Sequence, residues 1–507
     1  MYEEFKYLFS DILIYIKMSK ILFFNDKFLQ EYNNVEFKHH KLKLKKKIKS
    51  SNFNYIGYGS ILNNHQICFS SWKKKDRWAH GSSIYYTKSK NEYDFNIDNS
   101  QKVLSNKGQL CAHQCIIKDK SNRYLLLGGI RILLQHRMKY LSKKKIVGHS
   151  VKCLKNIQTI EYKNHKLLSN KYNQETCKSN GLYLMFSKNL SQWVNLFKTP
   201  LDVKLNDNII ESHITNRIIF TKKKFQKEKD DILKGKITPK LTKRLDVCNK
   251  IIKSCDWASL DMYDSQPSFF FDNKKQRYVL YTRDNVKTGI RYVEYHESPD
   301  LISWEKPVKI TIKSPNHFNF NKDNLYYFKV KYYPKYDYYI AIGKYYSSSI
   351  SGIYLFTSND GISWDRVSKI LNDNNVHCDN CIYEGSPIIS KDKRKLIFYS
   401  SYKLVELHIY ELRIDGYASI CNNSKDSKEG VFITKKIKLT DNIIINCESE
   451  QDGYIIIELL DSDMNSFHKF PIINGNNIEK ILSTDFKGFI HVKVTMKKSN
   501  IYSIIVQ

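Results

Sequence analysis

Two acidic residues occupy the same position in two repeated segments of the chain and could perform acid–base chemistry together. Asp264 stands eight residues before Asp272 (272 − 264 = 8), and Glu384 stands eight residues before Asp392 (392 − 384 = 8). Two carboxylates in one pocket suit glycoside hydrolysis, because one can protonate the leaving oxygen while the other activates water or attacks directly. The alternative is that each acid caps the turn that leads into a strand.

Three further residues are candidates for contacts with a substrate. Arg283 and Arg291 flank the turn that follows the first of these segments, and either could hold a hydroxyl or carboxylate group. Asp323 precedes the corresponding strand of another segment and is a third acid. The alternative for the two arginines is an ordinary charge at the end of a strand.

Metal and cofactor sites are not expected. Cys378 and Cys381 form a single C-x-x-C pair, and no second pair stands at the spacing of a zinc site. The chain has no glycine-rich phosphate loop and no local context for Ser-His-Asp or Cys-His catalysis. We therefore predict no metal and no cofactor.

A seven-residue pattern, Ser-x-Asp/Asn followed after three residues by an aromatic residue, indicates a repeated β unit. Its four copies are Ser89–Phe95, Ser187–Trp193, Ser298–Trp304 and Ser358–Trp364. The acidic or amide side chain can accept hydrogen bonds from the backbone two residues on, which makes a tight turn. The closing aromatic ring is then expected to pack onto the sheet.

Strand–turn–strand patterns precede these turns, so each unit predicts a four-stranded sheet. The five expected units cover residues 53–100, 111–203, 263–310, 323–370 and 382–420. A ring of such sheets is a β-propeller, in which the innermost strands converge on one axis. The fold class is therefore all-β, a five-bladed propeller, with a β-sandwich of similar strand content as the alternative that explains the turn motif less well.

Other segments interrupt or follow the propeller, which is expected over residues 53–421. Residues 1–52 are expected to form an N-terminal extension. Residues 131–174 are expected to be a basic insertion, and residues 204–262 an insertion that contains one helix over residues 221–250. After a polar linker, short alternating strands predict a C-terminal antiparallel β-sandwich over residues 430–507.

The 507 residues carry a formal net charge of +32. A basic chain invites a nucleic-acid interpretation, but the excess is mostly lysine in a chain rich in Asn, Ile and Tyr, as A/T-rich codons would give. We therefore expect no nucleic-acid partner. The 11 cysteines, an odd number, fit a reduced protein. We recognise no signal peptide or transmembrane segment, expect no membrane partner and an intracellular or virion location, and leave the oligomeric state open.

The five units, the Asp-then-Pro strand start and the Ser-x-Asp-Gly-x-x-Trp turn resemble the five-bladed propeller glycosidases of the invertase-like family 32 and the arabinanase/xylosidase-like family 43. The resemblance implies that Asp264 stabilises the transition state and that Glu384 is the general acid, with its proline one residue later than in the family pattern. The base or nucleophile of that group is a first-blade Asp. The first unit offers Asn63-Asn64-His65 and Asp76-Arg77-Trp78 instead.

Three functions are therefore open. The first is a glycoside hydrolase with an axial carboxylate pocket and a carbohydrate substrate. The second is a carbohydrate-binding or structural propeller, for instance in a virion, without hydrolysis. The third is polyanion binding by the lysine-rich insertions, which would show a strong dependence on salt.

Overall fold

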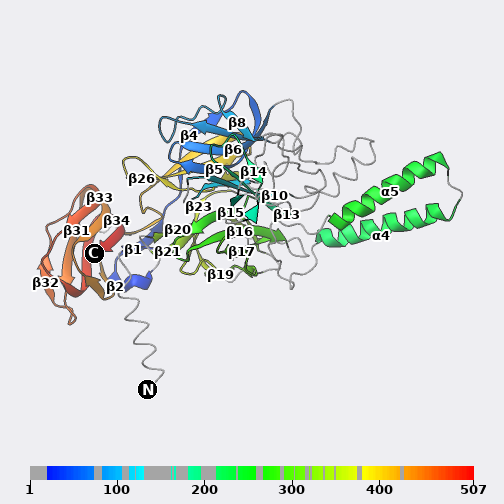
Figure 1. Ribbon diagram of the computed structural model, residues 1–507. Coiled ribbons are helices and arrows are strands. Elements are labelled where there is room, and N and C mark those ends of the chain that lie inside the picture. The colour runs from blue at the N-terminus through cyan, green and yellow to red at the C-terminus, as the bar shows by residue number, and fades with distance from the viewer. Residues whose placement is uncertain are drawn as a thin grey trace, which may run out of the picture.

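The structure is a computed structural model, and Figure 1 shows its arrangement. It describes residues 20–24, 26–73, 83–104, 114–119, 122–130, 161–162, 165–166, 181–195, 213–235, 238–257, 266–285, 291–301, 303–314, 319, 323–334, 337–347, 350–373, 379–422 and 428–507.

Within the described residues, five mainly antiparallel sheets form the five blades of a β-propeller. The first blade contains β5 (Phe53–Asn63), β6 (Gln66–Lys73), β7 (Ser83–Lys88) and β8 (Gln101–Leu104). The second contains β9 (Gln114–Lys118), β10 (Tyr124–Ile130), β13 (Gly181–Ser187) and β14 (Val194–Asn195). The third contains β15 (Ser268–Asp272), β16 (Arg277–Asn285), β17 (Arg291–Ser298) and β18 (Val308–Lys309).

The last two blades are each extended by a strand from elsewhere in the chain. The fourth contains β20 (Asn324–Tyr333), β21 (Tyr338–Tyr346), β22 (Ser351–Ser358) and β23 (Ser363–Leu371), with β19 (Thr311–Ser314) parallel to β23. The fifth contains β24 (Asn380–Ile382), β25 (Ile388–Ile389), β26 (Lys395–Tyr402) and β27 (Glu406–Arg413), and its outermost strand is β4 (Lys43–Lys49). The lysine-rich segment near the N-terminus is thus an edge strand that closes the ring.

Hydrogen bonds link the inner strands of neighbouring blades all the way round the axis. The Ser60 hydroxyl of the first blade accepts from the Ile116 amide of the second. The Ser268 hydroxyl of the third accepts from the Val330 amide of the fourth. The Glu384 amide of the fifth donates to a carbonyl of the first, which completes the circle. The predicted propeller is therefore a closed ring.

The seven-residue turns connect the third strand of a blade to its outer strand. In the fourth blade Asp360 Oδ1 accepts from the amides of Ile362 and Ser363, each at 2.7 Å. The Trp364 indole donates to the Gly361 carbonyl at 3.1 Å and is fully buried. Trp193 and Trp304 make the same bond to the residue three positions earlier. The three tryptophan rings therefore occupy the same place in their turns, whereas Phe95 of the first blade has no N–H to donate and is buried against Tyr399.

The C-terminal module is one antiparallel sheet of ten strands that encloses its own apolar core. Two long bulged strands, β31 (Ile443–Leu460) and β34 (Gly488–Val506), run through it. The shorter strands from the C-terminal part are β28 (Ala418–Asn422), β29 (Gly430–Thr434), β30 (Ile437–Leu439), β32 (Ser466–Lys469) and β33 (Asn476–Leu482). Buried residues alternate in β29 and in parts of β31 and β34, which matches the period-two strands that the sequence predicts here.

Residues 20–49, expected as an N-terminal extension, supply strands to both modules. Strands β1 (Lys20–Leu22), β2 (Leu29–Asn33) and β3 (Glu36–His39) pair with β34, β29 and β28 of the C-terminal sheet. The short 3-10 helix η1 (Asp26–Phe28) lies between the first two. The same stretch then continues into β4 of the fifth blade.

The helical insertion contains two helices where one was predicted, α4 (His213–Leu233) and α5 (Pro239–Trp257), and they form a hairpin that projects from the propeller in Figure 1. Gly235 follows the end of α4 and Pro239 is the first residue of α5, as expected of residues that end and begin helices. The basic insertion contains the two-stranded hairpin β11 (Glu161–Tyr162) and β12 (His165–Lys166), and Lys143–Lys145 lie outside the described residues. No helix of the described chain is long and apolar enough to cross a membrane.

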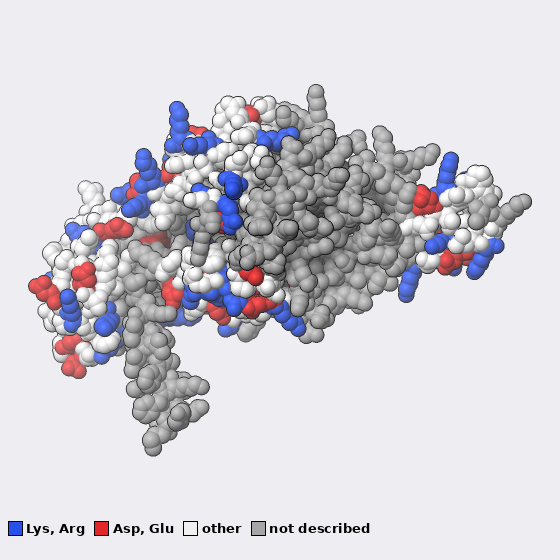
Figure 2. Space-filling view, viewed as in Figure 1, with Lys and Arg blue, Asp and Glu red and all other residues white. Residues whose placement is uncertain are grey.

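Acidic and basic side chains are interspersed on the face shown in Figure 2. Both signs occur over the C-terminal sheet and along the projecting helices. Several lysines of this chain also pair with acids, including Lys395 with Glu411 at 3.0 Å and Lys493 with Glu458 at 2.9 Å.

Candidate functional site

Glu384 lies at the propeller axis because the inner strand of the fifth blade is interrupted. Strand β24 ends at Ile382 and β25 begins at Ile388, and the residues between them bulge toward the first blade. The backbone of Glu384 bridges β5, donating to the Gly59 carbonyl and accepting from the Ile61 amide, both at 2.9 Å. Gly385 follows with a φ of 86°, a conformation that glycine adopts without strain.

The Glu384 carboxyl is buried between a hydroxyl and an ammonium group from two other blades. The Ser268 hydroxyl donates to Oε1 at 2.9 Å. Lys329 Nζ lies 3.4 Å from Oε2. Lys329 also donates to the carbonyls of Gln266 and Pro267, both at 3.1 Å. One carboxyl is thus joined to the third and fourth blades at the centre of the ring.

Burial raises the pKa of Glu384 above the ordinary glutamate value, and the Lys329 ammonium and the Ser268 hydrogen bond only partly oppose it. Burial also lowers the pKa of Lys329, against the attraction of Glu384. Desolvation disfavours the charged form of both groups, which explains the opposite directions. A carboxyl that keeps its proton to higher pH is suited to donate that proton.

Amide and hydroxyl groups of the other blades surround this pair. The Gln266 side chain donates to the carbonyls of Gly59 and Gln114 at 2.8 and 2.7 Å. The Gln114 amide in turn lies within hydrogen-bond distance of Ser60 and Tyr58. All five blades therefore contribute a polar group near the axis.

A cavity of about 300 Å³ adjoins Glu384 at the end of the axis where the inner strands finish. Glu384 and Lys331 are its charged residues near the axis, and Ile61, Ile116 and Phe269 are among its apolar ones. The Lys331 ammonium donates to the Pro387 carbonyl at 2.9 Å. The carboxyl thus borders space of the size that small-molecule sites occupy, about 300–1,000 Å³.

The two candidate arginines gather at the opposite end of the inner strands. Arg283 and Arg291 lie over the Tyr326 ring, with their guanidinium carbons 4.5 and 5.4 Å from its centre. Arg291 also donates to the Tyr346 hydroxyl at 2.8 Å. Tyr326 stands three residues before Lys329 on the same strand, so this cluster lies along the axis from Glu384.

Asp323 is buried at the start of β20 and accepts from the Asn319 amide at 2.8 Å. The adjacent Asn324 side chain accepts from the Arg291 amide at 3.0 Å, so Asp323 lies next to the arginine cluster. The structure thus brings Asp323, Arg283 and Arg291 to one end of the axis, while Glu384 borders the cavity at the other.

Asp264 and Cys378 fall outside the described residues, and so does Asp76 of the first unit. The described inner strand of the first blade, β5, carries no acid, and Ser60 is the residue bridged to Glu384.

Sequence reasoning did not find Lys329 and Ser268. Ser268 begins the apolar run of β15, Lys329 alternates with apolar residues in β20, and each meets Glu384 only across a blade boundary. The eight-residue spacing that identified Glu384 also locates the inner strands. Polar residues on the inner strands β15 and β20 could therefore have been considered as its neighbours.

No protein-family model and no curated protein matches the sequence. Among solved structures, the chain is similar to an exo-β-1,3-galactanase from Phanerochaete chrysosporium, with 8% identity, a TM-score of 0.37, and coverage of 93% of this chain and 100% of that one. It is also similar to an α-L-arabinanase from Penicillium chrysogenum, with 8% identity, a TM-score of 0.36, and coverage of 75% and 98%. A third is a thermostable family-43 glycoside hydrolase, with 10% identity, a TM-score of 0.37, and coverage of 71% and 89%.

Proposed function

We propose that this protein is a glycoside hydrolase in which Glu384 donates a proton to the leaving oxygen. The observation that carries the proposal is one buried carboxyl, at the meeting point of five blades, whose pKa is raised and which borders a cavity of about 300 Å³. Asp264 is proposed as the carboxylate that stabilises the transition state. Arg283, Arg291 and Asp323 are proposed to bind saccharide hydroxyl groups at the opposite end of the axis, as a contact site separate from the cavity beside Glu384.

A second candidate is a propeller that binds carbohydrate without hydrolysing it. The observation that favours it is the pairing of Glu384 with Lys329, which ties two blades together and engages the carboxyl in a structural contact. The serine at the position bridged to Glu384 in the first blade also favours it, because a hydroxyl there cannot replace an ionised base.

Hydrolysis of activated aryl glycosides, including arabinofuranosides and xylosides, tests the proposal. Because general acid catalysis contributes about 10²–10⁴-fold, we expect Glu384→Gln to lose at least 10²-fold in kcat/KM. The wild-type rate should fall as pH rises through the pKa of Glu384, since only the protonated carboxyl donates. That fall should lie above the ordinary glutamate value of 4.5.

The control is Glu411→Gln, which changes a half-buried glutamate on β27 that is paired with Lys395 and accepts from the Tyr93 hydroxyl, outside the cavity beside Glu384. It should leave the rate unchanged. Hydrolysis that survives in Glu384→Gln would overturn the role of Glu384. Saccharide binding by calorimetry, without turnover of any substrate, would favour the second candidate.

A further inference from the structure

A second cavity, of about 390 Å³, lies away from the axis, between the N-terminal segment and the fourth blade. Phe24, Lys27 and Phe28 line one wall, and the turn after β22 with the start of β23 lines the other. The N-terminal wall continues into the strands of the C-terminal sheet. The cavity therefore lies where the two modules meet.

The wall from the fourth blade is rigid because it is one of the repeated turns. Asp360 accepts two backbone amides and the Ser358 hydroxyl, the last at 2.9 Å. The buried Trp364 ring stabilises the turn by donating to the Gly361 carbonyl. Groups on this wall are therefore held in place before any ligand arrives, which lowers the entropic cost of binding.

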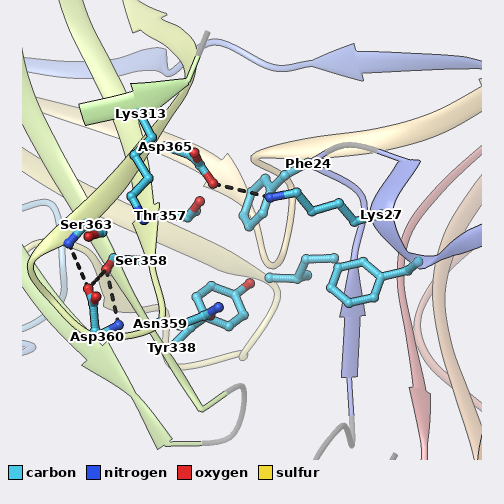
Figure 3. A pocket seen from close by; sticks show the side chains of 12 residues that line it. Phe24, Lys27, Lys313, Tyr338, Thr357, Ser358, Asn359, Asp360, Ser363 and Asp365 are labelled. Carbon is cyan, nitrogen blue, oxygen red and sulfur yellow. Dashed lines mark hydrogen bonds and ion pairs between the residues drawn. The ribbon is translucent and has the colours of Figure 1, made fainter. Parts of the chain in front are cut away.

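Aromatic rings and an ion pair form the middle of the cavity. The Phe24 and Tyr338 rings stand edge to face, with their centres 6.3 Å apart, and both border the space. Lys27 reaches across from the N-terminal wall to Asp365, at 3.4 Å (Figure 3). Rings beside fixed polar groups suit a ligand with one apolar face and several hydroxyl groups, since the ring buries the face while the polar groups bind the hydroxyls.

Two lysines and two aspartates line the cavity, so its formal charge is zero, but only one of the lysines is paired with an acid of the cavity. Asp360 is engaged by its own turn, and Asp365 is paired with Lys27. Lys313, on β19, extends toward Thr357 in Figure 3 and makes no ion pair with any residue that the structure describes. The Asn359 amide is exposed on the same rim. An ammonium, a hydroxyl and an amide thus stand together.

We propose that this cavity is a binding site for an acidic saccharide, whose sugar ring lies against Phe24 and Tyr338 and whose carboxylate pairs with Lys313. A carboxylate accepts a charge-assisted hydrogen bond from an ammonium, and the neighbouring Thr357 and Asn359 can bind ring hydroxyls. This site does not depend on Glu384 or on hydrolysis. It would hold a chain near the propeller whether or not the axial pocket cleaves it.

Isothermal titration calorimetry with digalacturonic acid tests the proposal, and its dimethyl ester is the matched ligand, because it keeps the rings and loses the charge. We expect the acid to bind at least tenfold more tightly than the ester. Glutarate, which carries carboxylates without a sugar ring, should not compete. If the ester binds as well as the acid, or if glutarate competes fully, the proposal is wrong.

Lys313→Gln should weaken binding of digalacturonic acid at least tenfold and leave binding of the ester unchanged. Lys306→Gln is the matched control, since it removes one exposed lysine of the same half of the propeller outside the cavity. Asn359→Ala should weaken both ligands. Glu384→Gln should bind as wild type, which separates this site from the axial one. An equal loss in Lys313→Gln and Lys306→Gln would mean non-specific attraction to a basic protein and would overturn the proposal.

Discussion

Lys329 and Glu384 illustrate how a single buried contact can have both structural and chemical consequences. Both side chains are almost fully inaccessible to solvent, at 2% and 5% exposure. Removing one member of such a pair is costly because the other is left as an uncompensated buried charge, whereas replacing both is tolerated better.

We therefore expect Lys329→Met to lower the free energy of unfolding by about 3–5 kcal/mol at neutral pH. The folded protein holds the Glu384 proton to higher pH than the unfolded chain does, so this group's contribution to stability falls as pH rises above 4.5. The loss in Lys329→Met should accordingly shrink toward acid pH. Urea denaturation at several pH values measures both effects.

The double variant Lys329→Met/Glu384→Gln is the control for this prediction. It removes the stranded charge and should recover part of the lost stability, although the Lys329 bonds to Gln266 and Pro267 remain absent. A double variant as unstable as Lys329→Met at every pH would show that the ion pair is not the cause.

A residue of the candidate site could be predicted from the sequence only where its position within the repeated unit was itself a signal. Glu384 was found because its distance from Asp392 is the same as that of Asp264 from Asp272. Ser268 and Lys329 have no such signal in the sequence, since their contacts with Glu384 depend on the angle between blades. Propensity and periodicity describe neighbours along the chain and contain no information about that angle.

At the scale of elements, the repeated turn is the unit that defines a blade. We expect Trp364→Ala to cost about 3–5 kcal/mol, because it removes a fully buried ring and leaves a cavity. Chemical denaturation followed by circular dichroism would measure it. Phe467→Ala, which truncates a ring 42% exposed on the C-terminal sheet, should change stability by less than about 0.5 kcal/mol. Similar losses in both variants would contradict the role given to the turn.

The blade strands and their turns were predictable because period-two burial and Asx turns are local signals. The partners of residues 20–49 were not, because pairing with strands more than 350 residues later depends on where the ring closes. The helical hairpin was predicted as one helix, since its amphipathic pattern continues past Gly235 with little change in composition.

At the scale of the whole molecule, Arg413 couples the propeller to the C-terminal sheet. It stands at the end of β27 and donates to Asn446 at 2.8 Å, Asn476 at 2.7 Å, and the carbonyls of Cys447 and Asn477 at 3.0 and 2.9 Å. Its guanidinium also lies over the Tyr502 ring. This planar group makes contacts that lysine cannot reproduce.

We expect the propeller and the C-terminal sheet to unfold at different temperatures in Arg413→Ala. Differential scanning calorimetry should then show two transitions where the wild type shows one, with a loss of about 2–3 kcal/mol from the hydrogen bonds to a charged group. Arg413→Lys should not restore the single transition. Arg394→Ala, which removes an exposed arginine of the same blade, is the control. If Arg413→Ala melts in one unchanged transition, the modules are coupled elsewhere.

Because β4 pairs with a strand near the end of the propeller, it remains unpaired for a long time during synthesis. Between Lys49 and its partner Glu406 the ribosome must add 357 residues (406 − 49 = 357). At about 5–20 residues per second this takes roughly 20–70 s. For that time the strand has no sheet to join, and an unpaired apolar strand would invite aggregation. Its sequence, KLKKKIK, keeps it charged, as edge strands commonly are. We expect nascent chains stalled before residue 406 to be cleaved by trypsin within 43–49, and released full-length chains to resist cleavage there.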